Sequence, residues 1–518
     1  MKMTIRNLAA TALALFTCAV ATPGQAEWRR AESPNFVVYS RGSESALRRY
    51  VRNLEIYDYL LRARMGLPLD RPASRKLPIY LVASRSGLVD IHPSTGPHVA
   101  GTYFPTGEDI FAAAIQDSEQ DFLLHEYFHH FSFQIGATST YPGWLVEGLA
   151  EYFMTAEIRP ESVAVGGYNE GRVAALFGAT WIPLEDLLTK RPGEVRRGGH
   201  AETYYPLAWL LTHWFMSDDA RRQQLAAYIR DLETGGHPVE AMQRATGLSL
   251  SDLRRELRGY RRLNITTYRA DFPQPEITVT RLPRSADDLL LIGQRLKVGV
   301  EEDKRDETAQ LVRRLAARHP DDPFAMLQLG HAELHFGDPE AGEAVLTRLL
   351  ELEPRNVEAL QLMASRYLRL AEEDIDQDIA HLVRAQGYLA RAYQADPNQY
   401  YTLQMLARTR EVAPDYPTEN DLLTWDLAFS IAPQLPSIRL GYAHALLAAG
   451  EFDTAVPILT PLANASHGGG AAESATQLLE RAYARQTTPG ELALEMASDL
   501  ADLGEGPDDA ADPPAGGS

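Results

Sequence analysis

The chain has 518 residues, which is too many for one ordinary domain and predicts two or three. Its formal net charge of -20 argues against binding to the phosphate backbone of nucleic acids, so we expect no nucleic-acid partner. The single cysteine, Cys18, lies near the N-terminus and excludes a disulfide framework or a thiolate metal site from the rest of the chain, where any metal must be held by His, Asp or Glu.

The first 26 residues have the three parts of a secretory signal peptide. A basic start is followed by an apolar run from Leu8 to Val20 and then by small residues that end at Ala26. The run is too short to span a bilayer, and no later stretch is apolar enough to predict a transmembrane helix. We therefore expect a mature chain that is periplasmic or secreted. A lipid anchor on Cys18 is the weaker alternative, because the residues before it fit a lipoprotein cleavage site poorly.

Residues 27–270 are predicted to form an α+β domain with a small mixed sheet and a helical part. Apolar alternation indicates strands, and apolar residues spaced by three and four indicate helices. In chain order we expect a strand over 36–39, a helix over 44–65, a strand over 76–82, and a hairpin over 101–105 and 109–114. After residue 119 the pattern is largely helical to about residue 262. Residues 271–285 contain three prolines and no helical period, which predicts a linker.

Residues 286–485 repeat themselves and predict an all-α solenoid. The segments that begin at Pro320 and Pro354 superimpose at an offset of 34 residues, and two later prolines continue the series. Small residues recur at matching positions, where they let paired helices approach closely. The pattern resembles tetratricopeptide repeats (TPR), which implies a concave surface that docks a protein partner. The last segment, 486–518, is acidic and contains Gly and Pro, so we expect it to be disordered.

The segment from His125 to His129 reads His-Glu-Tyr-Phe-His within an apolar helical pattern. On a helix the two histidines lie one turn apart on one face, so their imidazoles can converge on one metal ion. Glu126 lies beside them, where a carboxylate can hold and deprotonate a water. The alternative is a pair of histidines that packs on a core helix.

A second helix is predicted after Pro142-Gly143, and Glu147 falls on its first turns. A carboxylate within the run Trp-Leu-Val-Glu-Gly-Leu-Ala is costly to bury unless it is paired or binds a metal. As a third ligand, Glu147 completes a His2Glu set with one open position, which is typical of catalytic zinc. Glu151 lies one turn further on. It either accepts the free ring N–H of a metal-binding histidine or faces solvent.

Together, HExxH and the later Trp-Leu-x-Glu-Gly-x-Ala resemble the gluzincin metallopeptidases, in particular the bacterial peptidase-MA-like branch that is often fused to tetratricopeptide repeats. The resemblance implies a thermolysin-like domain with one zinc ion per chain, held by His125, His129 and Glu147, and Glu126 as the general base. Members of the family also use a downstream tyrosine to stabilise the oxyanion. By its spacing from Ala208, this role falls to Tyr205, with Tyr204 as the alternate and plain core packing as the competing interpretation for both.

One departure from the related zinc aminopeptidases bears on specificity. Their Gly-x-Met-Glu-Asn strand, which binds the free amine of a substrate, has no counterpart here. We therefore expect an endopeptidase, with an extended peptide substrate paired to the edge of the hairpin over 101–114.

The sequence thus predicts a periplasmic or secreted zinc-dependent peptidase that hydrolyses a peptide or protein substrate, with a TPR domain for protein docking. The alternative is a catalytically silent scaffold of the same fold that acts through its TPR domain. A third possibility is zinc-dependent hydrolysis of a non-protein amide.

Overall fold

The computed structural model describes residues 28–70, 72–97, 99–116, 121–136, 141–195, 200–261, 263–373, 378–465 and 469–486. The predicted signal peptide, 1–26, and all but the first residue of the predicted acidic tail lie outside these ranges. Within them, no helix is long and apolar enough to cross a membrane.

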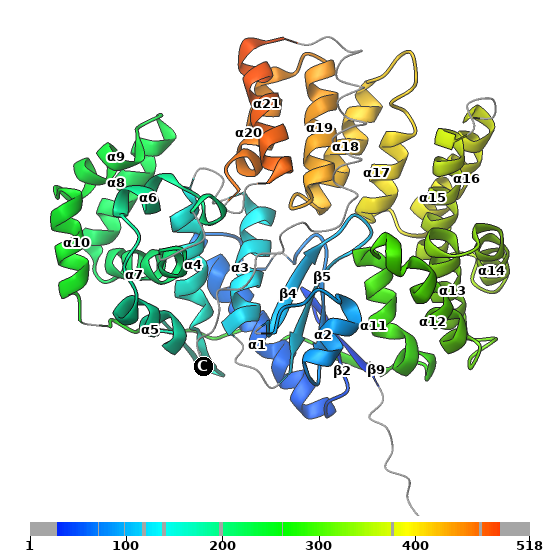
Figure 1. The fold of residues 1–518 in the computed structure, drawn as a ribbon, viewed down its shortest axis with the longest axis horizontal. Coiled ribbons are helices and arrows are strands. Elements are labelled where there is room, and N and C mark those ends of the chain that lie inside the picture. The colour runs from blue at the N-terminus through cyan, green and yellow to red at the C-terminus, as the bar shows by residue number, and fades with distance from the viewer. Residues whose placement is uncertain are drawn as a thin grey trace, which may run out of the picture.

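A six-stranded mixed sheet forms the middle of the molecule, in the order β4-β5-β3-β2-β1-β9 (Figure 1). Its strands are β1 (Arg29–Glu32), β2 (Phe36–Ser40), β3 (Leu77–Val82), β4 (Gly101–Pro105), β5 (Ile110–Ile115) and β9 (Thr278–Arg281). The strands β2, β3 and β5 run parallel, whereas β4 pairs antiparallel with β5 as the predicted hairpin and forms one edge. Strands β2 to β5 lie where the sequence predicts them.

Each face of this sheet is covered by helices, because the strands alternate apolar side chains to both sides. Val38, Ile79 and Ala112 belong to a buried cluster with helices α1 (Glu44–Met65) and α3 (Asp121–Ile135). Tyr80 and Phe111 point to the other face, where they are buried with α2 (Arg85–Ile91) and α11 (Ser285–Val298). The first helix of the repeat region is therefore part of the sheet domain's core.

The helical part lies beside the sheet and begins at α4 (Figure 1). Its helices are α4 (Gly143–Met154), α5 (Glu170–Gly178), α6 (Leu184–Thr189), α7 (Tyr204–Met216), α8 (Asp219–Glu233), α9 (Pro238–Thr246) and α10 (Leu250–Gly259). A three-stranded sheet that the sequence did not predict, β6 (Glu157–Arg159), β7 (Ser162–Val165) and β8 (Thr266–Arg269), completes this part.

The segment predicted as a linker, 271–285, contains an ordered strand. Within it, β9 pairs antiparallel with β1, with Thr278 opposite Glu32 and Arg281 opposite Arg29. The three prolines flank this strand rather than interrupt it, so they do not block its ladder of hydrogen bonds. The chain therefore returns to the first sheet before the repeats begin.

The repeat region is all helical, as predicted. Its helices are α11, α12 (Arg305–Ala316), α13 (Pro323–Phe336), α14 (Pro339–Leu352), α15 (Val357–Glu373), α16 (Asp378–Ala395), α17 (Tyr400–Arg408), α18 (Glu419–Ile431), α19 (Pro436–Ala448), α20 (Phe452–Ala463) and α21 (Gly470–Ala484). Glycines sit where paired helices cross. A Cβ on Gly330 would lie 2.5 Å from Leu346 Cγ, and one on Gly441 would lie 2.3 Å from Trp425 Cη2.

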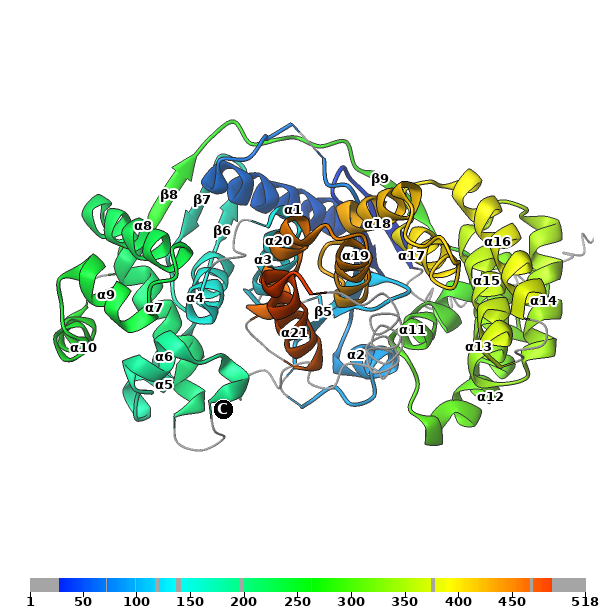
Figure 2. The same cartoon turned by 90° about the horizontal axis from the view of Figure 1, so that it is seen from above.

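The solenoid turns back over the middle of the molecule. Figure 1 shows α17 to α21 above the sheet and α3, and the view from above in Figure 2 places α19 to α21 over α3 and β5. Tyr400 and Leu403 of α17, with Ile431 and Ile438 further on, belong to the same buried cluster as α3. The repeat region is thus packed against the domain that carries the HExxH helix.

Candidate metal centre

The helix that carries the HExxH motif, α3, is fixed by burial and by a hydrogen bond to α1. The Tyr127 hydroxyl donates to Asp58 Oδ1 at 2.7 Å. Its apolar residues Leu123, Leu124, Phe128 and Phe131 are buried. His125 and His129 are 8% and 9% exposed, one turn apart on a different face. The packing of α3 therefore orients both imidazoles away from the apolar core.

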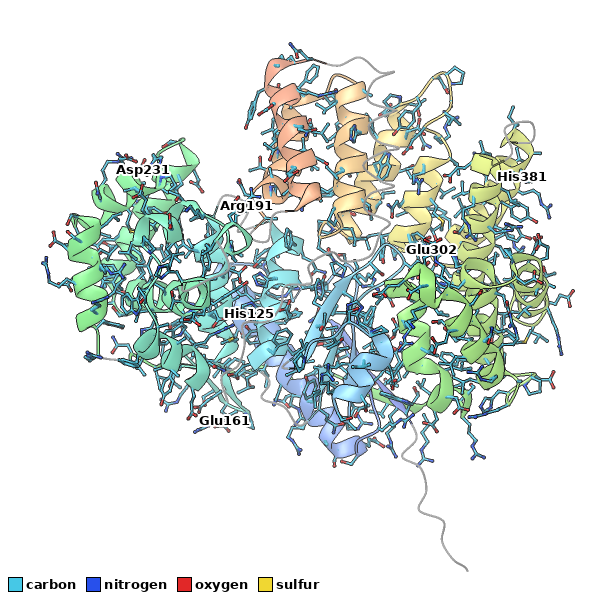
Figure 3. All side chains as sticks on the ribbon, viewed as in Figure 1. His125, Glu161, Arg191, Asp231, Glu302 and His381 are labelled. Atoms are coloured by element: carbon cyan, nitrogen blue, oxygen red, sulfur yellow. The ribbon has the colours of Figure 1, made fainter. Side chains whose placement is uncertain are left out.

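The structure brings the three predicted ligands to one point. His125 Nε2 and His129 Nε2 are 3.1 Å apart. Glu147 on α4 is fully buried, and its Oε2 lies 3.5 Å from His125 Nε2 and 3.4 Å from His129 Nε2. One ligand atom from each residue lies within 4.8 Å of the other two. Figure 3 shows His125 near the centre of the molecule, between the sheet and the helical part.

The charges around this point favour a cation. Burial alone would lower the pKa of His129, but Glu147, with Glu126 and Glu151, raises it to about 9. The negative potential is therefore large enough to overcome desolvation of a positive charge. Two imidazole nitrogens and one carboxylate are a donor set that zinc accepts, and three protein ligands leave one position open. The residues present fit a zinc ion.

A glycine next to Glu147 lets α4 pack closely on α7. Helices α4 and α7 cross at Gly148, where a Cβ would lie 2.1 Å from Thr212 Oγ1 and 2.6 Å from the Ala208 carbonyl oxygen. Only a residue without a side chain fits there. The same close crossing brings Tyr205, at the start of α7, toward Glu147.

Glu151 is buried and faces both His125 and an arginine. Its Oε1 lies 3.5 Å from His125 Nδ1, and Arg172 of α5 donates to both carboxylate oxygens, at 2.9 and 2.7 Å. Glu151 is buried, so the solvent-facing interpretation is wrong, while its 3.5 Å separation from His125 Nδ1 is longer than an ordinary hydrogen bond. Arg172 was not predicted, because nothing in its local sequence indicates that α5 packs on α7 and so brings Arg172 to Glu151.

The two candidate tyrosines differ in what their hydroxyls contact. Tyr204 is 1% exposed, and its hydroxyl donates a hydrogen bond to the Lys190 carbonyl at 2.9 Å. Its O–H is therefore already used within the fold. Tyr205 is half-buried, with its ring centroid 6.5 Å from that of His125 and the Arg172 guanidinium 5.1 Å from its own. Burial, and then Glu147, raise the pKa of Tyr205 well above its ordinary value, so the phenol keeps its proton.

Glu126 and the edge strand β4 flank the cluster. Glu126 is half-buried, and its charge acts on both His129 and Tyr205. On β4, the Tyr103 hydroxyl lies 2.8 Å from Nδ1 of His130, which is buried and points off the ligand face. This contact ties the edge of the sheet to α3.

The returning repeats contact two loops of the domain that carries the HExxH helix. The Tyr400 hydroxyl lies 3.5 Å from the Thr106 carbonyl in the β4–β5 turn, and the Arg75 guanidinium lies 5.4 Å from the Tyr400 ring centroid. On the other side, Arg191 donates to the Ala463 carbonyl at the end of α20, and Figure 3 shows Arg191 near that helix.

Comparison with known proteins identifies the repeats. Residues 304–408 match the family model described as Tetratricopeptide Repeats-Sensor. A crystal structure of a thermophilic TPR protein from Thermus thermophilus is similar at 19% identity, with a TM-score of 0.30, over 42% of this chain and 99% of that chain. No curated protein matches the chain. The family match confirms TPR-type repeats over residues 304–408, a kind of repeat that binds proteins.

Proposed function

We propose that this chain is a zinc-dependent peptidase of the gluzincin kind, periplasmic or secreted, with a TPR region that docks a protein partner. The observation that carries the proposal is the convergence of His125, His129 and Glu147 within 4.8 Å, beside the half-buried Glu126. A site that only held a metal would not need a free carboxylate at that position. A thermolysin-like arrangement of this domain is part of the proposal.

A bound zinc ion would be held by His125, His129 and Glu147, and it would supply Lewis acidity and lower the pKa of a water molecule. The outer contacts support this assignment. Glu151 faces Nδ1 of His125 and favours a proton there, which leaves the Nε2 lone pair directed at the cluster. Arg172 holds Glu151 in place through two hydrogen bonds.

The chain's own residues account for the proton transfers. Glu126 accepts a proton from the attacking water and passes it to the leaving amine. Tyr205 keeps its proton because burial raises its pKa, so its O–H can donate to the oxygen that becomes negative in the transition state. Tyr204 does not take this role, because its O–H already donates to the Lys190 carbonyl.

The edge strand β4 supports an extended peptide as the substrate. It is the outermost strand of the sheet on the side of α3, to which Tyr103 ties it. A peptide could add to this edge through main-chain hydrogen bonds and pass the metal cluster, which is the arrangement an endopeptidase uses.

The second candidate is a silent scaffold that acts through its repeats. The packing of the repeats over α3 favours it. Because the two regions share a buried core, the first domain could support the repeats structurally even if it catalysed no reaction. The half-buried Glu126 argues against it, since a scaffold gains nothing from an acid beside the metal ligands.

The test combines metal content with cleavage. We expect Glu147→Ala to lose about one zinc equivalent relative to the wild-type mature chain in elemental analysis after dialysis. Wild-type protein should cleave an unstructured protein or members of a peptide library, and Glu126→Gln should retain zinc without cleaving. Equal zinc in wild type and Glu147→Ala would overturn the proposal. Zinc binding with no cleavage of any peptide would favour the scaffold, unless a non-protein amide is hydrolysed.

A further inference from the structure

A second cluster of potential metal ligands lies where the repeats meet the first sheet. We propose that Glu108, His331 and His335 form a second zinc site, which fastens the repeat region to the β4–β5 hairpin. Among the described residues, this group and the HExxH cluster are the two in which three ligand atoms lie within 4.8 Å of one another. The proposal does not depend on peptidase activity.

The two histidines have the spacing of a chelating pair. His331 and His335 lie one turn apart on α13, with ring centroids 5.1 Å apart. Glu108 reaches them from the turn between β4 and β5, and its Oε2 lies 3.3 Å from His331 Nε2. The ligands thus come from two elements that are far apart in the sequence and are held together by the packing of α11 and α13.

Burial leaves ring nitrogens of this cluster without hydrogen bonds. His331 is 1% exposed, and neither of its nitrogens makes a hydrogen bond that satisfies distance and angle with a described residue. Nε2 of His335 is also buried and lacks such a partner. Burying a polar atom without a hydrogen bond is unfavourable, so unpartnered nitrogens on two adjacent imidazoles call for a ligand that binds one nitrogen of each.

An ion pair alone accounts for only part of this arrangement. A protonated His331 would pair with Glu108 but would leave Nε2 of His335 without a partner, whereas an ion bound by all three residues would leave only the second ring nitrogen of His331. A metal ion uses one atom from each of the three residues. Two imidazoles and one carboxylate suit zinc among the divalent ions.

The neighbouring charges do not occupy the site. Lys297 Nζ lies 2.8 Å from Glu358 Oε1 and 3.6 Å from Asp109 Oδ2, so its charge is balanced by other carboxylates. Arg369 donates to the Leu334 carbonyl at 2.8 Å. Glu108 is therefore left to face the two histidines.

The residues around this second cluster are suited to a structural ion rather than to a catalytic one. Ala332 follows the first histidine, where α3 has Glu126. The nearby Glu333 is engaged by Arg313, with both hydrogen bonds at 2.7 Å. Without a free carboxylate, an ion here would stabilise the contact between α13 and the hairpin, and would do so only in the folded chain.

The experiment counts zinc in the full mature chain after dialysis against metal-free buffer. We expect about two ions in wild type and about one each in His335→Gln and Glu108→Gln. Glu147→Ala should also hold about one, because it affects only the first cluster. His319→Gln, in the same region but outside both clusters, should hold two. His335→Gln with wild-type zinc would overturn the proposal and leave Glu108 and His331 as an ion pair.

A second measurement covers the case in which these variants do not fold. A chain without two ligands of the first cluster, His129→Ala with Glu147→Ala, should bind one Co²⁺ and show the visible absorption of a low-coordinate site. Added zinc should remove that absorption and raise Tm. Absence of Co²⁺ binding in this folded variant would overturn the proposal. Failure of the proposed function would appear separately, as equal zinc in wild type and Glu147→Ala.

Discussion

Helices α3 and α13 carry the same histidine spacing and differ in what surrounds it. In both, the imidazoles lie one turn apart and face a carboxylate from another element, Glu147 or Glu108. Only α3 has a half-buried carboxylate directly after the first histidine. On the proposed assignments, histidine spacing and one carboxylate suffice for an ion site, whereas catalysis also requires a further acid and a donor such as Tyr205.

The largest effect should come from exchanging the acid that distinguishes the two helices. We expect Glu126→Gln to lower kcat by about 10³–10⁴-fold, because Glu126 is the group proposed to accept the proton from water. Zinc content should be unchanged, since Glu126 is not among the three converging ligands. The measurements are steady-state cleavage of a peptide substrate and elemental analysis.

The matched control is Glu333→Gln on α13. Its carboxylate binds Arg313, so this variant should lose stability by about 1–3 kcal/mol while the cleavage rate of the folded protein stays at the wild-type value. If both glutamine variants kept full activity, the distinction between the two helices would be wrong.

The next largest effect concerns the two adjacent tyrosines. We expect Tyr205→Phe to lower kcat by about 10²–10³-fold with little change in KM, since the hydroxyl acts in the transition state. Tyr204→Phe should instead lower Tm through loss of its hydrogen bond to the Lys190 carbonyl, with kcat nearly unchanged. The reverse pattern would assign the role to Tyr204.

A smaller effect should appear in metal affinity. We expect Arg172→Gln to weaken zinc binding at the first cluster by about 10–100-fold, because Glu151 would lose the two hydrogen bonds that hold it against His125. Titration against a chelator measures this change. Binding at Glu108, His331 and His335 should be unaffected, and an equal loss at both sites would show a general effect on folding.

The first cluster could be predicted from sequence because its geometry is local. Two residues that are four positions apart on a helix lie about one turn apart. The prediction that His125 and His129 face the same point needed only that rule. The placement of Glu147 required one further step, a second helix after a Pro-Gly break. The strands β2 and β3 of the first sheet were likewise predicted, from the short apolar stretches 36–39 and 76–82.

The second cluster could be predicted only in part: His331 and His335 have the same local spacing as the first pair, but no local pattern joins them to Glu108. Their contact depends on how α11 covers the sheet and how α13 then packs, which is a property of the whole fold. The same holds for Arg172, whose contact with Glu151 depends on the packing of α5 on α7. The strand β9 was missed for another reason, because nearby prolines outweighed the β-branched residues of Thr278–Arg281.

The smallest predicted effect is on the pH dependence of stability. It tests whether a partly buried carboxylate of this protein stays charged only where a cation faces it. In Glu108, burial favours the neutral acid, but His331 lowers the pKa to about 2. Glu411, after α17, has a buried Oε1 with no hydrogen bond to a described residue, and burial raises its pKa to about 8 against a weaker effect of Arg408.

Between about pH 4.5 and 8, Glu411 is therefore ionised in the unfolded chain and protonated in the folded one. Stability falls as the pH rises through this range, because the unfolded chain binds fewer protons. Glu411→Gln should thus have little effect near pH 4 and should stabilise by about 1–2 kcal/mol above pH 8, measured by thermal unfolding. Glu480 is exposed, so Glu480→Gln should show no such dependence on pH. If the effect of Glu411→Gln did not change with pH, Glu411 would be ionised in the folded chain and the prediction would be wrong.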